Sequence, residues 1–124
     1  MGQTVLVVDD NALNRELLRL VLEQQGYAVV EATTAEEALT MVRDGHPALV
    51  LMDCHLPGMD GLTATRQLKG IEATCSIPVV AVTAHAMPGD RERALAAGCN
   101  EYISKPVDFS RLITIVSKLV PASS

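Results

Sequence analysis

Residues 4–10 read Thr-Val-Leu-Val-Val-Asp-Asp (TVLVVDD), an apolar run that ends abruptly in two acids. A short apolar run without polar alternation is typical of a strand that is buried on both faces of a parallel sheet. Asn11 follows the acids and is a suitable N-cap for a helix. The stretch therefore predicts a strand, an acidic turn and a helix, which is how an α/β fold begins.

The same alternation of strand and helix continues along the chain. We predict strands at residues 4–8, 28–32, 49–52, 79–82 and 102–103. We predict helices from Asn11 to Gly26, after a capping box at Thr34–Glu37, over 62–68, from Asp90 to Gly98, and after Asp108. In the first helix, the helical spacing predicts a core-facing stripe of Leu13, Leu17, Leu20 and Val21. In the last helix, we predict that Leu112, Ile115, Val116 and Leu119 face inward, whereas Ile113 and Val120 lie off that stripe.

Five strand–helix units in alternation predict a parallel sheet with helices on both faces. Right-handed crossovers then restrict the possible topologies. Strands one, three and four are apolar throughout and should be central, whereas strands two and five should be edges. This fits strand order 2-1-3-4-5, a known doubly wound order that we adopt rather than derive. The predicted fold class is thus α/β, a flavodoxin-like (βα)5 sheet. We expect one domain over residues 1–124, with its core at about 4–120.

Composition excludes several classes of function. The chain has 124 residues, a hydrophobic fraction of 48% and a formal net charge of -5. Its basic residues are scattered and its field is acidic, so we expect no direct binding of nucleic acid. Three cysteines at 54, 75 and 99 do not suggest a disulfide framework. There is no apolar stretch of membrane-spanning length and no leader, so we expect a cytoplasmic domain without membrane contact.

Polar side chains follow the strands at the point where each strand ends. Asp9 and Asp10 follow the first strand, Asp53 the third, Thr83 the fourth and Lys105 the fifth. The carboxyl ends of parallel strands meet at one edge, and ligands bind there where the strand order reverses. Each residue alone is more simply explained as a cap or a surface group, but their arrival at one edge together predicts a site.

The chemistry of this site follows from its charges. Crowded carboxylates repel one another, and a divalent cation relieves that repulsion. Oxygen ligands favour Mg²⁺, Mn²⁺ or Ca²⁺. A carboxylate beside such a metal can attack phosphorus and form an aspartyl phosphate, with Lys105 and the hydroxyl of Thr83 binding phosphoryl oxygens.

Nearby polar residues are less decisive. Asn14 is as readily a solvated helix residue as a functional one. His55 and His85 flank the site, and we interpret their rings as modulators of access rather than as metal ligands. A His–Cys metal site that includes Cys54 is a weak alternative, because Cys54 should point away from Asp53.

At this point the sequence resembles the receiver domain of two-component response regulators, from Thr4 to Val120. The resemblance rests on Val7–Asn11 (VVDDN), Met52–Gly61 (MDCHLPGMDG), Val82–Ala84 (VTA) and Lys105–Pro106. It is closest to receivers that are fused to hybrid sensor histidine kinases, because Asn11–Arg15 (NALNR) and Gly89–Pro106 look like that branch. If this domain is part of such a hybrid kinase, membrane segments elsewhere in the parent chain would anchor it; a stand-alone regulator is the alternative.

The resemblance implies a role for each site residue. Asp53 would be the phosphoacceptor, fed by a histidine kinase or a histidine phosphotransfer protein. Asp10 and Asp53 would bind Mg²⁺ (or Mn²⁺) by their side chains, Asp9 mostly through water, and His55 through its backbone carbonyl. Lys105 would pair with the phosphoryl group, and the Lys105–Pro106 peptide would be cis. The domain would catalyse only its own phosphorylation and slow dephosphorylation, so it would be a signalling module rather than an enzyme.

The resemblance also implies a two-state switch. Phosphorylation adds negative charge, Thr83 would move as the switch hydroxyl, and Tyr102 would turn inward as the switch aromatic. The face of the fourth helix, fifth strand and last helix would then change, and an effector or a second copy would bind it. Ile113 and Val120 are the apolar side chains that we expect on this face.

Two alternatives from other classes share part of the pattern. A small phosphatase would use the same carboxylate, metal and lysine, but the first strand lacks the Asp-x-Asp nucleophile pattern and there is no room for a substrate cap. A flavin-binding module of the same fold would need a phosphate loop after the first strand. The acids there repel phosphate, and few aromatic residues are present to stack on a flavin.

Overall fold

The chain folds as a parallel sheet whose strands alternate with helices. The structure, a computed structural model, describes residues 3–84 and 88–121. His85 lies outside the described residues, so its predicted influence on access stays a prediction. In chain order the elements are β1 (Thr4–Val8), α1 (Ala12–Gln24), β2 (Ala28–Ala32), α2 (Ala35–Gly45), β3 (Leu49–Asp53), α3 (Gly61–Lys69), β4 (Val79–Thr83), α4 (Asp90–Ala96), β5 (Glu101–Ser104) and α5 (Phe109–Leu119).

The five strands pair in the order β2-β1-β3-β4-β5, which confirms the predicted topology. All neighbouring pairs are parallel. The apolar strands β1, β3 and β4 are central, because their side chains must be covered on both faces. Asp53 and Thr83, expected just beyond their strands, are the last residues of β3 and β4.

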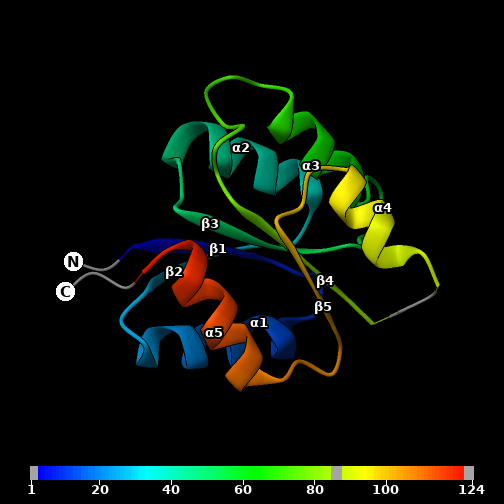
Figure 1. Cartoon of the computed structure of the whole chain (residues 1–124). Helices are drawn as coiled ribbons and strands as arrows, with labels where there is room; N and C mark the ends of the chain where they lie inside the picture. The colour runs from blue at the N-terminus through cyan, green and yellow to red at the C-terminus, as the bar shows by residue number, and fades with distance from the viewer. Residues whose placement is uncertain (1–2, 85–87, 122–124) are drawn as a thin grey trace.

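Helices form one layer on each side of this sheet. In Figure 1, α1 and α5 lie below the sheet, and α2, α3 and α4 lie above it. Each layer packs against the sheet around its own apolar cluster. The cluster below the sheet includes Leu18, Leu22, Leu112 and Val116. The cluster above it includes Ala38, Val42, Ala64 and Leu68. No helix in the described part of the chain is long and apolar enough to span a membrane.

Helix starts follow the sequence closely. Each of four side chains accepts a hydrogen bond from the backbone N–H three residues later, which satisfies a donor that the helix leaves free. These caps are Asn11, Thr34, Asp60 and Asp108, and three of them were predicted. In the capping box, Glu37 accepts from the backbone N–H of Thr33 at 2.7 Å, one residue before the cap.

The predicted core face of α1 is wrong. The side chains of Leu13, Leu17 and Leu20 are 62%, 40% and 52% exposed, and Val21 is half-buried. Leu18 and Leu22, four residues apart, fill the core instead. The helix carries two leucine stripes, and the position of the sheet decides which one is covered. Leu13, Leu17 and Leu20 therefore form an exposed apolar surface on α1, which the sequence alone did not reveal.

The prediction that Val120 contributes to an exposed apolar face at the end of α5 is wrong. Val120 is buried, at 7% exposure, and packs in the cluster below the sheet. The hydroxyl of Tyr27 donates to the carbonyl of Val120 at 2.6 Å and fastens the end of α5 to the start of β2. Ile113 is half-buried. Val120 therefore adds nothing to an apolar partner surface on α5.

Candidate functional site

Three carboxylates meet at the carboxyl edge of the central strands. Val8 lies opposite Met52 in the β1–β3 ladder, so Asp9 and Asp53 emerge beside each other. Asp9, Asp10 and Asp53 each offer an oxygen within 4.8 Å of the others, an arrangement that can hold a metal ion. Asp9 and Asp53 are buried, whereas Asp10 is exposed. The predicted convergence of these residues is confirmed as geometry.

Lys105 reaches this cluster from the loop after β5. Its Nζ donates to Oδ2 of Asp9 at 2.9 Å and to Oδ2 of Asp53 at 3.3 Å. Burial by itself lowers the pKa of Lys105, but the two carboxylates outweigh burial and hold that pKa above its ordinary value. The ammonium is therefore charged at neutral pH. The Lys105–Pro106 peptide is cis, as the resemblance implied.

Main-chain donors orient the two buried acids. The N–H of Asn11 donates to Oδ1 of Asp9 at 2.8 Å, and the N–H of His55 donates to Oδ1 of Asp53 at 2.9 Å. Burial raises the pKa of Asp53 and the neighbouring charge of Asp9 adds to it, although His55 and Lys105 act in the opposite direction. One lysine against three carboxylates leaves negative charge, and hard oxygen donors with excess negative charge suit a divalent cation such as Mg²⁺.

Helix α3 approaches the site more closely than a larger residue would permit. A Cβ built on Gly61 would lie 2.0 Å from the carbonyl oxygen of Asp53. The N–H of Gly61 donates to the carbonyl of Cys54 at 3.2 Å. The Asp60 cap and the glycine after it therefore start α3 directly against the strand that carries Asp53.

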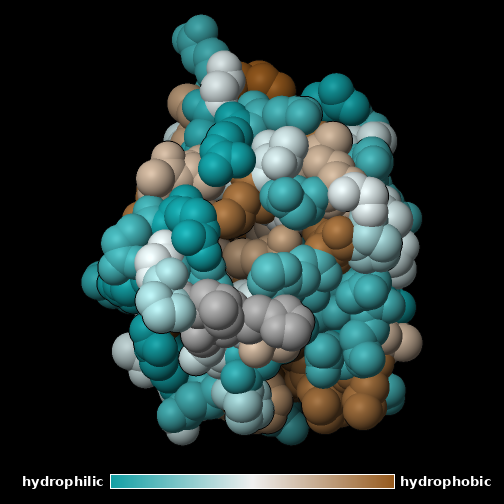
Figure 2. All heavy atoms as spheres, turned by 90° about the vertical axis from the view of Figure 1, so that its right-hand side faces the viewer, coloured by the Kyte–Doolittle hydropathy of each residue, from teal (hydrophilic) through white to brown (hydrophobic). Residues whose placement is uncertain are grey.

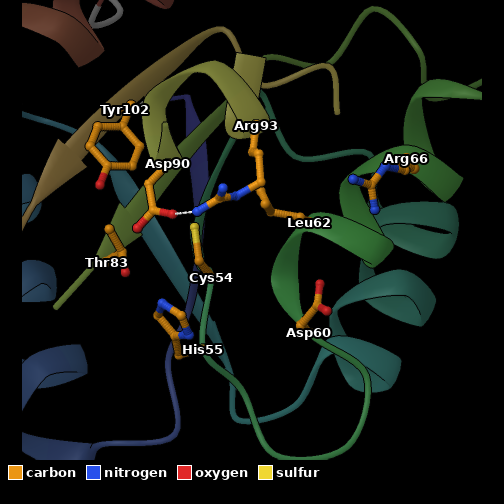
Figure 3. Close-up of a pocket in the computed structure, with 9 residues that line it drawn as sticks. All are labelled: Cys54, His55, Asp60, Leu62, Arg66, Thr83, Asp90, Arg93 and Tyr102. Carbon is orange, nitrogen blue, oxygen red and sulfur yellow. Dashed lines mark hydrogen bonds and ion pairs between the residues drawn. The ribbon is translucent and has the colours of Figure 1, made fainter. Parts of the chain in front are cut away.

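A cavity of about 320 Å³ lies beside this cluster, lined by residues of α3, α4, β4, β5 and the loop after β3. Figure 3 shows the side chains of Thr83 and Tyr102 at one side, and the Asp90–Arg93 ion pair across the middle. The hydroxyl of Tyr102 is buried and has no hydrogen-bond partner among the described residues. The two expected switch residues thus share one cavity, with the phenol already turned inward.

Cys54 faces the same cavity, on the opposite side of the chain from Asp53. Burial raises the pKa of its thiol to about 12, so the thiol is protonated at neutral pH and is a poor metal ligand. The described residues contain one metal-competent group of three or more acidic, histidine or cysteine side chains, the three aspartates. The weak alternative of a His–Cys site gains no support.

The other side of the cluster opens onto an apolar groove. This groove of about 270 Å³ is lined by Leu17 of α1, Phe109 of α5, Pro106 and Lys105, among others. Figure 2, which faces the carboxyl edge, shows an apolar patch at its lower edge, in the layer of α1 and α5. Lys105 therefore links the acidic cluster to an exposed apolar surface.

Two polar side chains of α1 contact Asp9: Asn14, whose role the sequence left open, and Arg15, which sequence reasoning missed. Arg15 donates from Nη1 to the carbonyl oxygen of Asp9 at 2.7 Å, and Asn14 donates from Nδ2 to Oδ2 of Asp9 at 3.5 Å. Both lie in the first turn of α1, one turn from the Asn11 cap. Both contacts depend on the side of α1 that faces the end of β1, and the local sequence pattern does not specify that side.

Comparison with known proteins decides the family. Residues 5–117 match the family model of the response regulator receiver domain. The chain belongs to this family. It is 45% identical over 116 residues to the polar-differentiation response regulator DivK of Brucella ovis, a match that covers 94% of each chain. The DivK protein of Brucella anthropi is 43% identical over the same length.

Solved receiver structures have the same fold. A putative response regulator from Chloroflexus aurantiacus matches with a TM-score of 0.90 and 32% identity, covering 94% of this chain and 96% of that one. The receiver domain of sensor histidine kinase PA1611 from Pseudomonas aeruginosa matches with a TM-score of 0.88 and 35% identity, covering 96% and 98%. That structure holds a magnesium ion in its active site cleft. Receivers of both kinds, regulators and kinase-linked domains, thus resemble this chain, and fusion to a hybrid kinase stays a prediction.

Proposed function

We propose that this chain is a phosphoacceptor that takes a phosphoryl group on Asp53 from a phosphohistidine of a histidine kinase or a phosphotransfer protein. The observation that carries the proposal is the contact of Lys105 with both Asp9 and Asp53. An oxygen of Asp53 attacks phosphorus and forms an O–P bond. The N–P bond of the donor breaks, and its electron pair stays on the imidazole, which then takes a proton.

We assign Mg²⁺, or Mn²⁺, to the three aspartates, with side-chain ligands from Asp10 and Asp53. Asp9 would act through water, and the backbone carbonyl of His55 would complete the protein ligands. The clustered oxygens support this assignment, as does the magnesium ion in the PA1611 receiver. When bound, Mg²⁺ neutralises charge on the carboxylates and on the phosphoryl oxygens. Lys105 would then turn from the carboxylates toward the phosphoryl oxygens.

We propose that phosphorylation is read through Thr83 and Tyr102. Thr83 is 1% exposed and ends the strand next to Asp53, and its hydroxyl would move to bind phosphoryl oxygens. The hydroxyl of Tyr102 in the same cavity, which has no partner in the described part of the chain, would respond to that movement. The elements α4, β5 and α5 would then pass the change to an effector or a second copy. Leu95, 41% exposed on α4, supports an apolar contact there.

The phosphodonor, we propose, covers the apolar face of α1. Leu13, Leu17 and Leu20 make this face, and the groove of Leu17 and Phe109 leads directly to Lys105. A donor seated there would bring its phosphohistidine to Asp53. We place the exchange in the cytoplasm, where free thiols such as those of the three cysteines persist. We treat residues 1–124 as one receiver domain that acts as a signalling module.

Intact mass spectrometry tests the proposal. The protein is incubated with Mg²⁺ and either acetyl phosphate or phosphoramidate, whose P–N bond resembles that of phosphohistidine. We expect the wild type to gain one phosphoryl group and the Asp53→Asn variant to gain none. Excess EDTA should abolish the gain. No gain from either donor would contradict the phosphoacceptor role, and a gain in both proteins would mean that another residue is the acceptor.

A further inference from the structure

Arg15 connects the acidic cluster to the edge of the sheet. Its Nη1 donates to the main-chain carbonyl of Asp9 at 2.7 Å, while its Nε donates to Oε1 of Glu31 on β2 at 3.0 Å. The Arg15 side chain is only 15% exposed. A planar guanidinium offers several donors in a fixed fork, so one side chain can hold two acceptors at a set angle.

Glu31 is a firm anchor for this fork. Arg19, one turn further along α1, donates from Nε to the other oxygen of Glu31 at 2.7 Å. Burial alone would raise the pKa of Glu31, but Arg19 and Arg15 outweigh it and hold that pKa below its ordinary value. The carboxylate is therefore ionised at neutral pH, and Arg15 is held on the β2 side of the site.

The contact of Arg15 falls where the chain turns from β1 into α1. The N–H of Asp9 donates to the carbonyl of Ala32 at 3.2 Å, and the Asn11 N–H holds the Asp9 carboxylate. Arg15 adds a hydrogen bond to the carbonyl oxygen of Asp9, which belongs to the Asp9–Asp10 peptide group. Asp10, which is exposed, follows this peptide directly, so the orientation of the peptide determines where its Cα lies.

We propose that Arg15 is a positioning residue for the metal site, acting on the Asp9–Asp10 peptide and not on the metal. The inference rests on the proposed function, since it presumes that the three aspartates bind Mg²⁺. Groups that orient metal ligands typically change metal affinity 10- to 100-fold when they are removed. Arg15 does so through a main-chain oxygen, with Glu31 fixing its far side.

The sign of the effect separates positioning from simple electrostatics. Arg15 is a cation close to a site for another cation, so Coulomb repulsion alone predicts that its removal strengthens Mg²⁺ binding. Positioning predicts the opposite, that removal weakens Mg²⁺ binding. The two explanations therefore differ in direction and not only in size.

Isothermal titration calorimetry with Mg²⁺ tests this on the full chain. We expect Arg15→Gln to raise the Kd for Mg²⁺ about tenfold. Arg15→Lys keeps the charge but loses the fork, and should also raise the Kd. Arg19→Gln is the matched control, because Arg19 shares Glu31 and the same helix without touching Asp9. It should leave the Kd unchanged or lower it slightly.

Each other outcome overturns a stated part of the inference. Equal or tighter Mg²⁺ binding by Arg15→Gln would overturn positioning, and so would an equal rise of the Kd in Arg19→Gln. Thermal unfolding in EDTA checks that each variant folds, and Arg15→Lys carries the test if Arg15→Gln does not fold. A wild type that binds no Mg²⁺ would overturn the proposed metal site itself, and the inference with it.

Discussion

At the scale of single residues, a substitution of Thr83 tests whether the readout of phosphorylation can be separated from phosphorylation itself. We expect Thr83→Ala to accept a phosphoryl group on Asp53 from acetyl phosphate, because Asp53, Lys105 and the acids remain. The amide resonances of α4, β5 and α5, which we expect to move in the phosphorylated wild type, should move little in the variant. Loss of one buried hydroxyl should cost roughly 1 kcal/mol of stability. Two-dimensional amide NMR before and after phosphorylation measures the response.

Thr65 provides the control for that variant. It is also fully buried, and its hydroxyl donates to the carbonyl of Gly61 at 2.8 Å within α3. Thr65→Ala should have a similar cost in stability and keep the full response of α4, β5 and α5. An unchanged NMR response in Thr83→Ala would refute the switch role of this hydroxyl.

The residues at the strand ends could be predicted from the sequence, whereas their neighbours could not. Asp9, Asp53, Thr83 and Lys105 follow apolar runs, and parallel strands bring such positions to one edge whatever the details of packing. Arg15 touches the site only because α1 is rotated to bring it over the end of β1. That rotation depends on the packing of the whole helix against the sheet, and no local pattern specifies it.

At the scale of elements, α1 shows where sequence periodicity stops being decisive. Its two leucine stripes both fit helical spacing. A prediction from that spacing alone therefore selected the stripe that is exposed in the structure. In α5 a single stripe dominates: Leu112, Ile115 and Val116 are buried as predicted, and Leu119 is half-buried against the same cluster. When a helix has one apolar face, the sequence predicts which face is buried. When it has two, one packs in the core and the other stays exposed, and the sequence does not say which is which.

The exposed stripe leads to a prediction about the donor. The double variant Leu13→Ser/Leu17→Ser should change stability by less than about 1 kcal/mol, because surface substitutions are usually within roughly 0.5 kcal/mol each. Transfer from a phosphorylated histidine phosphotransfer protein should slow about tenfold or more, whereas phosphorylation by acetyl phosphate should not change. Quench-flow transfer assays with both donors measure the two rates.

Leu22→Ala is the contrasting variant, because Leu22 lies on the same helix but in the core. Truncation of a buried leucine should cost roughly 2–5 kcal/mol, with no selective loss of transfer from the protein donor as long as the domain is folded. Equal slowing with acetyl phosphate and with the protein donor in Leu13→Ser/Leu17→Ser would mean that the stripe supports the site itself and not the docking of the donor.

At the scale of the whole molecule, we expect burial of the Asp53 charge to lower stability when no metal is bound. Because the pKa of Asp53 is raised in the fold, the folded chain binds this proton more tightly than the unfolded chain does. Its contribution to the free energy of unfolding therefore falls as pH rises from the ordinary carboxyl range through the raised pKa. In EDTA at neutral pH, Asp53→Asn should be more stable than the wild type. That difference should shrink as the pH falls and the wild-type carboxyl becomes protonated.

Mg²⁺ should make the wild type more stable than Asp53→Asn. A ligand that binds only the folded state stabilises it by RT ln(1 + [L]/Kd), about 2.7 kcal/mol at one hundred times Kd. Wild type should gain this stability with Mg²⁺ at neutral pH, and Asp53→Asn should gain much less because it has lost one carboxylate ligand. Thermal unfolding of both proteins, at neutral and acidic pH and with EDTA or Mg²⁺, measures the four differences. A wild type that is more stable than Asp53→Asn in EDTA at neutral pH would mean that the Lys105 contact outweighs burial of the charge. The charges of the three acids would then already be compensated within the fold, and Mg²⁺ binding would relieve little repulsion among them.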